Sequence, residues 1–404
     1  MAIYYFLVKI AKSFIMILRK AASNLPLKDV IIFSSIPDFS DSVREVFDLM
    51  TTMEEFKGFR FVWFCEEPKK ARKLIGRSAK VKKRTENPLL RLRHLVCEST
   101  AKYCVYSHEV IGNIYNPKQV RAHIEHGSFG IKKGVGSTKL YEYSTYRILT
   151  RETSLPNGRI CGLPRNDRLF DPPEQTRRKL ELDGYAKIII WMPTFKHYKK
   201  RSILHVQRND YGEETDSDIT LQEDAGFFEE VNKTLNKHNM LLINKYHPSQ
   251  DMRYVDAREF SNISVVTDEE LLAADVRLYS FLGAADALVT DFSSVCYDYF
   301  LLDRPVGFDV TDLELYIQGG TCAVDDPLDY MPGEHIRSLQ DFIRFLENVA
   351  NGVDEYRGAR NKLLDMIHFY KDDQSSKRVV DLILSSDQKK EPVNANSQKT
   401  PPHI

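Results

Sequence analysis

The clearest structural signal in the sequence is the stretch AADALVTDFSSV at residues 284–295. Its centre, Ala287–Thr290, is a short apolar run of the kind that forms a buried strand in a parallel sheet. The residues after it predict a helix that runs to about Leu302 and is capped by Ser293 or Ser294. The free amides at such a helix start, with the positive end of the helix dipole, can hold a phosphate or pyrophosphate. A plain capped helix without a ligand is the alternative.

Similar β-rich runs alternate with helical patterns on both sides of this stretch, which predicts parallel sheets wrapped by helices. The runs in the first half are Val30–Phe33, Phe59–Cys65, Tyr103–Ser107, Arg121–Glu125 and Arg147–Thr150. Those in the second half are Lys187–Met192, Met240–Lys245, Ile263–Thr267, Ala287–Thr290 and Pro305–Phe308. We therefore expect an α/β protein with two Rossmann-like domains that face a central cleft and meet near Leu163–Pro173. Ligands of such sheets collect at the carboxyl ends of the strands.

The composition is that of a folded protein with a reduced interior. The 404 residues are enough for two domains, and 42% of them are hydrophobic. Lys and Arg (57) balance Asp and Glu (57), so the whole-chain charge gives no reason to expect a nucleic-acid partner. The six cysteines include no C-x-x-C pair, which argues against a disulfide framework or a zinc site and predicts free thiols in a cytosol.

Two segments of the first half are strongly basic. Residues 1–28 contain five Lys or Arg and no acid, and the apolar side chains share one side of a helix. This pattern predicts a helix that lies in the plane of a membrane, or alternatively a first helix that faces the core. Between Lys69 and Arg93, eleven Lys or Arg residues accompany one acid, Glu86, which indicates attraction to anionic lipid or to a phosphate-rich acceptor, unless it is merely a solvated surface.

Two polar segments of the second half are not expected to carry a site. Asp216-Ser217-Asp218 is expected to lie in a solvated loop rather than to bind a metal, because its surroundings are polar. The residues 387–404 are rich in Lys, Asn, Ser and Pro and are predicted to be disordered.

Polar side chains follow several of the predicted strands. After Arg121–Glu125 comes a histidine with a glycine- and lysine-bearing loop that suits an anion, namely His126, Gly127, Ser128, Lys132 and Lys133. After Lys187–Met192 come Thr194 and Lys196, and after Met240–Lys245 comes His247. A single histidine is more often structural than catalytic. Two of them at strand ends in opposite domains indicate one shared site, although no Walker loop or complete G-x-G-x-x-G is present.

Several ordered motifs together resemble those of the CDP-glycerol:poly(glycerophosphate) glycerophosphotransferase family of teichoic acid primases and polymerases. They are HGS at 126–128, GLPRND at 162–167, PTFK at 193–196, KYHP at 245–248, TDFSS at 290–294 and RP at 304–305. The resemblance covers roughly Val30 to Leu384. It implies a GT-B fold, an enzyme at the membrane surface and a CDP-polyol donor in the C-terminal domain.

The resemblance also implies roles for individual residues. His126 matches the proposed catalytic base, His247 the second essential histidine, and Ser293 and Ser294 the donor-binding serines. Ser376 and Arg378, in the last helix, match further donor contacts.

Other roles follow from chemistry and position. An acceptor hydroxyl that attacks the distal phosphorus must lose its proton, which His126 is suited to take. His247, the amides at Ser293 and Ser294, and Lys132 or Lys196 are expected to stabilise the developing charge, so we predict transfer without a metal or other cofactor.

Four charged or polar residues have more than one interpretation. Asp291 either orients the serine loop, accepts from a ribose hydroxyl or caps a turn. Arg165, Asn166 and Asp167 lie at the domain junction, where they form a structural hinge or contact the donor phosphate.

The predicted organisation has four parts. They are a membrane-associating helix (1–28), an acceptor-side domain (29–165), a CDP-donor-binding domain with the terminal helices (166–386) and a tail (387–404). The expected activity is transfer of glycerol phosphate from CDP-glycerol to a hydroxyl of a lipid-linked or oligosaccharide acceptor, with release of CMP, at the cytoplasmic face of a bacterial membrane. The polymer is a teichoic acid or a capsule-type polymer. The alternatives are a CDP-ribitol transferase, a GT-B glycosyltransferase that uses a nucleotide sugar, and a membrane-surface module without turnover.

Overall fold

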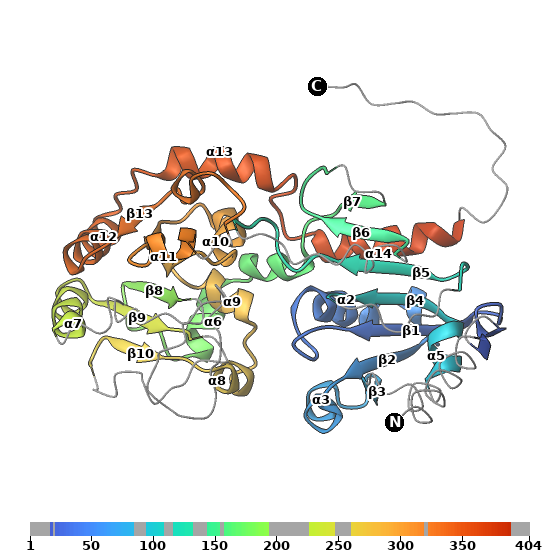
Figure 1. The fold of residues 1–404 in the computed structure, drawn as a ribbon. Coiled ribbons are helices and arrows are strands. Elements are labelled where there is room, and N and C mark those ends of the chain that lie inside the picture. The colour runs from blue at the N-terminus through green and yellow to red at the C-terminus, as the bar shows by residue number, and fades with distance from the viewer. Residues whose placement is uncertain are drawn as a thin grey trace, which may run out of the picture.

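Two parallel β-sheets form the cores of two lobes that lie side by side in the computed structural model (Figure 1). The structure describes residues 17–18, 21–84, 94–108, 116–131, 144–153, 157–193, 226–246, 260–318 and 322–388. We call the lobe built on the first sheet the N-terminal lobe and the other the C-terminal lobe.

The N-terminal lobe contains seven parallel strands in the order β3-β2-β1-β4-β5-β6-β7. Their bounds are β1 Lys28–Ser34, β2 Arg60–Cys65, β3 Lys80–Lys83, β4 Ala101–Tyr106, β5 Val120–Ile124, β6 Tyr146–Leu149 and β7 Gly158–Ile160. Successive residues of a strand point to opposite faces of the sheet. Ile31 and Phe33 accordingly pack against α2 (Asp41–Thr52), whereas Val30 and Ile32 belong to a separate core with α5 (Leu95–Thr100).

The C-terminal lobe contains six parallel strands in the order β10-β9-β8-β11-β12-β13. Their bounds are β8 Lys187–Met192, β9 Met240–Asn244, β10 Ile263–Val265, β11 Ala287–Thr290, β12 Val306–Asp309 and β13 Glu334–Ile336. Its helices are α6 Pro173–Lys179, α7 Phe227–Lys237, α8 Asp268–Ala273, α9 Leu278–Gly283, α10 Val295–Tyr299, α11 Leu313–Gln318, α12 Leu339–Asn351 and α13 Arg357–Ile367. Helices α7 and α12 cover one face of this sheet, and α9, α10 and α13 cover the other.

The predicted α/β class with two Rossmann-like sheets is confirmed, and each predicted strand is present within one or two residues of its expected bounds. Three strands were not predicted, namely β3, β7 and β13. The basic segment that begins at Lys69 forms part of α3 (Pro68–Ile75) and strand β3, while residues 85–93 lie outside the described residues.

The connection between the lobes is the 3-10 helix η3 (Pro164–Phe170), which contacts both α2 and α9. The chain later returns, because α14 (Ser375–Gln388) packs on the N-terminal lobe beside β5 and β6 (Figure 1). Val379, Val380 and Ile383 are buried in the core of that lobe, so burial of this apolar face holds the helix there. This differs from the prediction that assigned the terminal helices to the C-terminal domain.

Both ends of the chain fall mostly outside this description. Of the predicted membrane-associating helix, residues 1–16 and 19–20 lie outside the described residues, as does the tail beyond Gln388. Among the helices that are described, none is long and apolar enough to cross a bilayer.

Candidate functional site

His126 occupies the carboxyl end of β5, where the sequence predicted it. Its Nδ1 lies 3.0 Å from Oδ2 of Asp41, and its side chain is 59% exposed. Nε2 of the ring has no hydrogen-bond partner among the described residues. One nitrogen of His126 is thus held by the protein, while the side chain as a whole is largely exposed.

Asp41 is the first residue of α2 and was not predicted as a site residue. Its side chain is only 9% exposed, and its backbone is left-handed, with φ at 58°, a conformation that Asp tolerates better than most residues. Burial alone would raise the pKa of Asp41, but the nearby Arg165 guanidinium and the hydrogen bond from His126 hold it well below its usual range. Asp41 is therefore ionised and accepts a hydrogen bond from the N–H at Nδ1 of His126.

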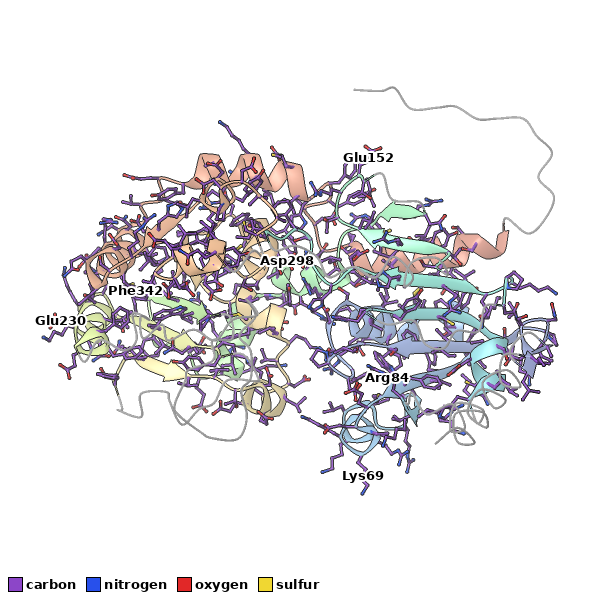
Figure 2. The ribbon with its side chains drawn as sticks, viewed as in Figure 1. Lys69, Arg84, Glu152, Glu230, Asp298 and Phe342 are labelled. Carbon is purple, nitrogen blue, oxygen red and sulfur yellow. The ribbon has the colours of Figure 1, made fainter. Side chains whose placement is uncertain are left out.

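Arg165 connects this pair to the other lobe. Its guanidinium donates to Oδ1 of Asp41 at 3.1 Å and to Oδ2 of Asp298 at 2.7 Å. Asp298 is fully buried and also accepts from Tyr279 at 2.7 Å and from Asn166 at 3.3 Å. Figure 2 shows Asp298 on the side of the C-terminal lobe that faces the N-terminal lobe. The positions of Arg165 and Asn166 agree with the structural alternative, in which these residues fix the geometry of the junction.

The serine loop, residues 291–294, lies between β11 and α10. Helix α10 continues as a 3-10 helix to Leu302, as expected. Ser294 occupies the N-cap position, but the predicted side-chain cap is not made. Its φ and ψ of −68° and −9° are helical, whereas a capping serine has an extended backbone that brings its Oγ to the free amides. The hydroxyl of Ser294 is therefore not used as a cap.

The base loop, residues 126–131, lies beside the serine loop. A Cβ on Gly127 would be 3.7 Å from Oγ of Ser294. Phe129 packs against Tyr297 of α10, with ring centroids 4.9 Å apart, and Ile131 is buried in the core of the C-terminal lobe. The loop that begins in one lobe therefore ends in the other, and this brings His126 and Ser294 to the same region.

His108 is a second histidine that the sequence analysis missed. It follows β4, the neighbour of β5, and its ring centroid is 4.3 Å from that of His126. Its Nδ1 lies 3.1 Å from Oγ of Ser107, and burial, together with the nearby His126, lowers the pKa of His108 to about 4. The rule that found His126, which looks just past each strand end, would also have found His108.

Asp167 and the start of α14 form a separate junction. The carboxylate of Asp167 accepts from the backbone amides of Ser375 at 2.8 Å and Ser376 at 2.7 Å. Arg378 pairs with Asp372, and its guanidinium lies 3.6 Å from the ring centroid of Tyr370. These contacts give Asp167 a structural task, while a donor contact by Ser376 or Arg378 stays a prediction.

The remaining predicted residues divide into two groups. Ser128 and Asp291 are buried, Ser293 is half-buried, and contact of any of them with a donor or acceptor stays a prediction. His247, Thr194, Lys196, Lys132 and Lys133 lie outside the described residues. The expected convergence of His126 and His247 therefore also stays a prediction.

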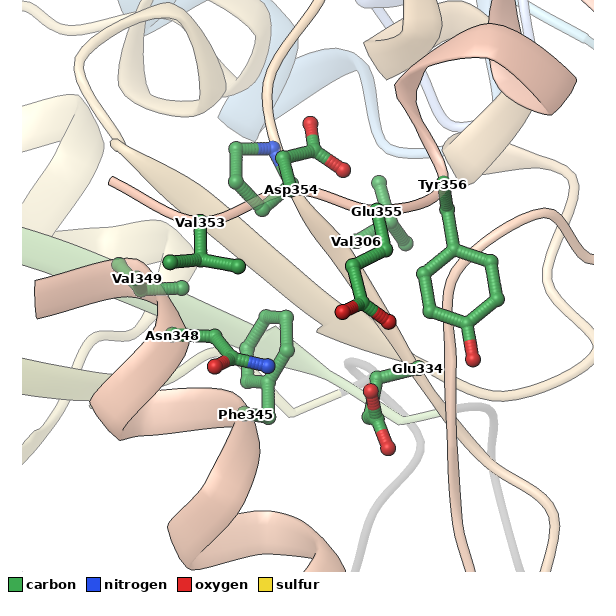
Figure 3. Close-up of a pocket in the computed structure, with 10 residues that line it drawn as sticks. Val306, Glu334, Phe345, Asn348, Val349, Val353, Asp354, Glu355 and Tyr356 are labelled. Carbon is green, nitrogen blue, oxygen red and sulfur yellow. The ribbon is translucent and has the colours of Figure 1, made fainter. Parts of the chain in front are cut away.

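A small cavity lies elsewhere in the C-terminal lobe (Figure 3). Its volume is about 20 Å³, and Val306, Glu334, Phe345 and Tyr356 are among the residues that line it. Such a volume has room for about one water molecule and is far too small for a nucleotide. Among the residues that the structure describes, no group of three or more His, Cys, Asp or Glu side chains is arranged to hold a metal.

The fold and the comparisons together define the class of protein. Two parallel sheets in facing lobes form a GT-B-like glycosyltransferase fold, and the solved structure of the wall teichoic acid polymerase TagF shares it, with a TM-score of 0.70, 17% identity and coverage of 96% of this chain and 97% of that one. The sequence model of the CDP-Glycerol:Poly(glycerophosphate) glycerophosphotransferase family matches residues 149–385 of this chain. The chain belongs to this family.

Curated relatives include enzymes of teichoic acid synthesis. The teichoic acid ribitol-phosphate polymerase TarK of Staphylococcus aureus is 27% identical over 227 residues, which are 54% of this chain and 39% of the relative. The teichoic acid glycerol-phosphate primase of Bacillus subtilis is 27% identical over 167 residues, or 41% of this chain and 36% of the relative. The chain thus spans well under two thirds of the length of these relatives.

Proposed function

We propose that the protein transfers glycerol phosphate from CDP-glycerol to a hydroxyl of a lipid-linked or oligosaccharide acceptor and releases CMP, as a step in teichoic acid or capsule-type polymer synthesis. One observation carries the proposal. An exposed imidazole, held at Nδ1 by an ionised carboxylate, lies beside the serine loop of the opposite lobe. Membership of the family supports the CDP-polyol donor.

The proposed reaction is an in-line displacement at the distal phosphorus of the donor. The acceptor oxygen forms a new bond to that phosphorus, the bond to the CMP oxygen breaks, and the hydroxyl proton moves to Nε2 of His126. A well-placed general base of this kind contributes ~10²- to 10⁴-fold to the rate. Negative charge grows on the leaving CMP, and we assign its stabilisation to the amides at Ser293 and Ser294 and to His247, Lys132 or Lys196, without a metal.

We also propose that the protein works at the cytoplasmic face of the membrane. The exposed basic side chains of α3, β3 and the turn between them support this location; they are Lys69, Lys70, Arg72, Lys73, Arg77, Lys80 and Lys83. Lys69 projects from the outer edge of the N-terminal lobe (Figure 2). Sedimentation with vesicles that contain or lack anionic lipid tests the location. The wild type is compared with a triple variant, Lys69→Glu, Lys73→Glu and Lys80→Glu, and separately with a protein that lacks residues 1–20.

A CDP-ribitol donor is the second candidate, because the relatives include a ribitol-phosphate polymerase. A panel of CDP-glycerol, CDP-ribitol and nucleotide sugars, with products followed by mass spectrometry, distinguishes the candidates. We expect CMP and a new phosphodiester from a CDP-polyol. A nucleoside diphosphate released from a nucleotide sugar would instead identify a glycosyltransferase and refute the proposal.

Substitution of the base provides the second arm of this experiment. His126→Ala should abolish CMP release while donor binding and folding persist. His238→Ala is a matched control, because His238 lies next to Glu347 in the C-terminal lobe and belongs to no part of the site. Undiminished turnover in His126→Ala would show that His126 is not the general base.

A further inference from the structure

We infer that Asp41 is the positioning residue of His126: it fixes the tautomer of the imidazole so that Nε2 keeps the lone pair that accepts the proton. This inference rests on the proposed function for its catalytic meaning, but the tautomer itself is a property of the protein alone. Nothing in the motifs of the sequence singled out Asp41, which precedes His126 by 85 residues.

The tautomer follows from the state of the carboxylate. Oδ1 and Oδ2 of Asp41 lie 3.1 and 3.3 Å from the Arg165 guanidinium, and this permanent cation keeps the buried carboxylate ionised. An ionised carboxylate has only acceptor atoms. The hydrogen at 3.0 Å separation must therefore belong to Nδ1 of His126, and the neutral ring carries no proton on Nε2. An isolated histidine side chain in water favours the tautomer with the proton on Nε2. The carboxylate of Asp41 therefore reverses the intrinsic preference of the ring.

A second histidine also packs against the ring. His108 lies with its ring centroid 4.3 Å from that of His126, at an interplanar angle of 52°. Both neighbours of the ring have left-handed backbones, with φ at 58° for Asp41 and 64° for His108. Such conformations are unfavourable for residues other than glycine and persist where the surrounding structure requires them. Asp and His tolerate this conformation better than most residues, and at these two positions it accompanies side chains that contact His126.

Asp41 also makes the position of the base depend on the other lobe. The same guanidinium that binds Asp41 is held by Asp298, which is buried in α10 immediately after the serine loop. Arg165 is itself buried, so it is not free to turn toward water. The orientation of His126 is therefore set by a chain of charged groups that ends beside the proposed donor loop.

The test compares the ring nitrogens of His126 at pH 8 in the wild type, in Asp41→Asn and in the control variant Asp48→Asn. Long-range ¹H–¹⁵N spectra of histidine-labelled protein separate the two tautomers, and His126→Ala identifies the signal among the eleven histidines. We expect wild-type His126 to carry its proton on Nδ1. Asp41→Asn, whose amide both accepts and donates and whose backbone tolerates the left-handed conformation, should lose this preference.

Kinetics provide the second readout. Asp41→Asn should lower kcat for CMP release by about 10²- to 10⁴-fold, the range for a misplaced general base, with the KM for donor nearly unchanged. Asp48→Asn is the matched control, because Asp48 lies on the same helix and pairs with Arg277 of the other lobe without contacting His126. It should retain the wild-type tautomer and kcat.

Three results would overturn the inference. They are an Nε2-protonated His126 in the wild type, an unchanged kcat in Asp41→Asn, and an equal loss of kcat in both variants, which would indicate a general effect of lobe docking. The wild-type spectrum decides the matter even if Asp41→Asn does not fold. If no CDP-polyol yields CMP, the proposed function fails while the spectrum still tests the role of Asp41.

Discussion

Glu45 lies one helical turn beyond Asp41 on α2, where the two lobes meet. Its carboxylate is 7% exposed, accepts from Nε of Arg168 at 2.6 Å and lies 3.8 Å from Nε of Arg277. Burial raises the pKa of Glu45 from its ordinary value of 4.5 to about 7, and the attraction of Arg168 offsets only part of this rise. We therefore predict that charging Glu45 destabilises the folded protein, in spite of its ion pair.

The sign and the size follow from proton linkage. Between pH 4.5 and about 7 the folded protein binds the Glu45 proton more tightly than the unfolded chain does. The stabilising contribution is therefore complete below pH 4.5 and is lost as the pH rises through about 7. At about 1.4 kcal/mol per pH unit, the wild type should lose up to about 3 kcal/mol of unfolding free energy relative to Glu45→Gln.

Urea unfolding at pH 5, 6, 7 and 8 measures this difference. The two tryptophans report on different lobes, because Trp63 lies in the N-terminal core and Trp191 in the C-terminal core. Trp191→Phe, introduced into both proteins, leaves Trp63 as the reporter of the lobe that contains α2. Subtracting the unfolding free energy of one protein from that of the other at each pH cancels the contributions of the other titrating groups, because the two proteins share them. The prediction would be refuted if the unfolding free energies of the two proteins changed in parallel with pH, or if that of the wild type increased relative to Glu45→Gln as the pH rises. Either result would show that the ion pair outweighs the cost of burial.

Three further predictions concern the same region. Gly162→Ala should cost about 1–3 kcal/mol in urea unfolding, because φ is +81° at this position and the new Cβ would lie 2.4 Å from Oγ of Ser375; an unchanged midpoint would contradict this. Asp298→Asn should cost about 3–5 kcal/mol, because it leaves the buried Arg165 with one carboxylate, and a change below 1 kcal/mol would argue against the network. The C2 proton of His108 should show a neutral ring at pH values down to about 5 in NMR titration, since its pKa is lowered to about 4, whereas a midpoint near 6.5 would contradict the burial argument.

The strands that the sequence predicted are those with an apolar run. Val30–Phe33 and Lys187–Met192 are buried on both faces of their sheets, and such strands need continuous apolar sequence. Strands β3, β7 and β13, with the sequences KVKK, GRI and EHI, lie at sheet edges and are only three or four residues long. An edge strand is paired on one side alone, and charged residues there oppose further pairing. Their sequences therefore lack the pattern on which the prediction depended.

The site residues that could be predicted are likewise those with a local sequence signal. His126 and the serine loop could be predicted because each directly follows a strand, where the geometry of a parallel sheet gathers functional groups. Asp41 could not, because its role depends on a contact across 85 residues and its local sequence indicates only a helix start. The location of α14 could not be predicted either, because an apolar helix face indicates burial but does not indicate which lobe buries it.

Helix α2 presents an acidic face to three arginines at the junction of the lobes. Asp41, Glu45 and Asp48 are spaced four and three residues apart, so they share a face of the helix, which is directed at Arg165, Arg168 and Arg277. Separating the lobes would take the arginines away and leave three carboxylates near one another on one face of the helix. Like charges at this spacing destabilise a helix, so pairing with the arginines favours the docked arrangement. Because Asp41 both holds His126 and belongs to this face, an arrangement of the lobes that breaks its contact with Arg165 also removes the support of the proposed base. Docking of the lobes and orientation of the base thus meet at Asp41, whereas Glu45 and Asp48 take part in docking without contacting His126.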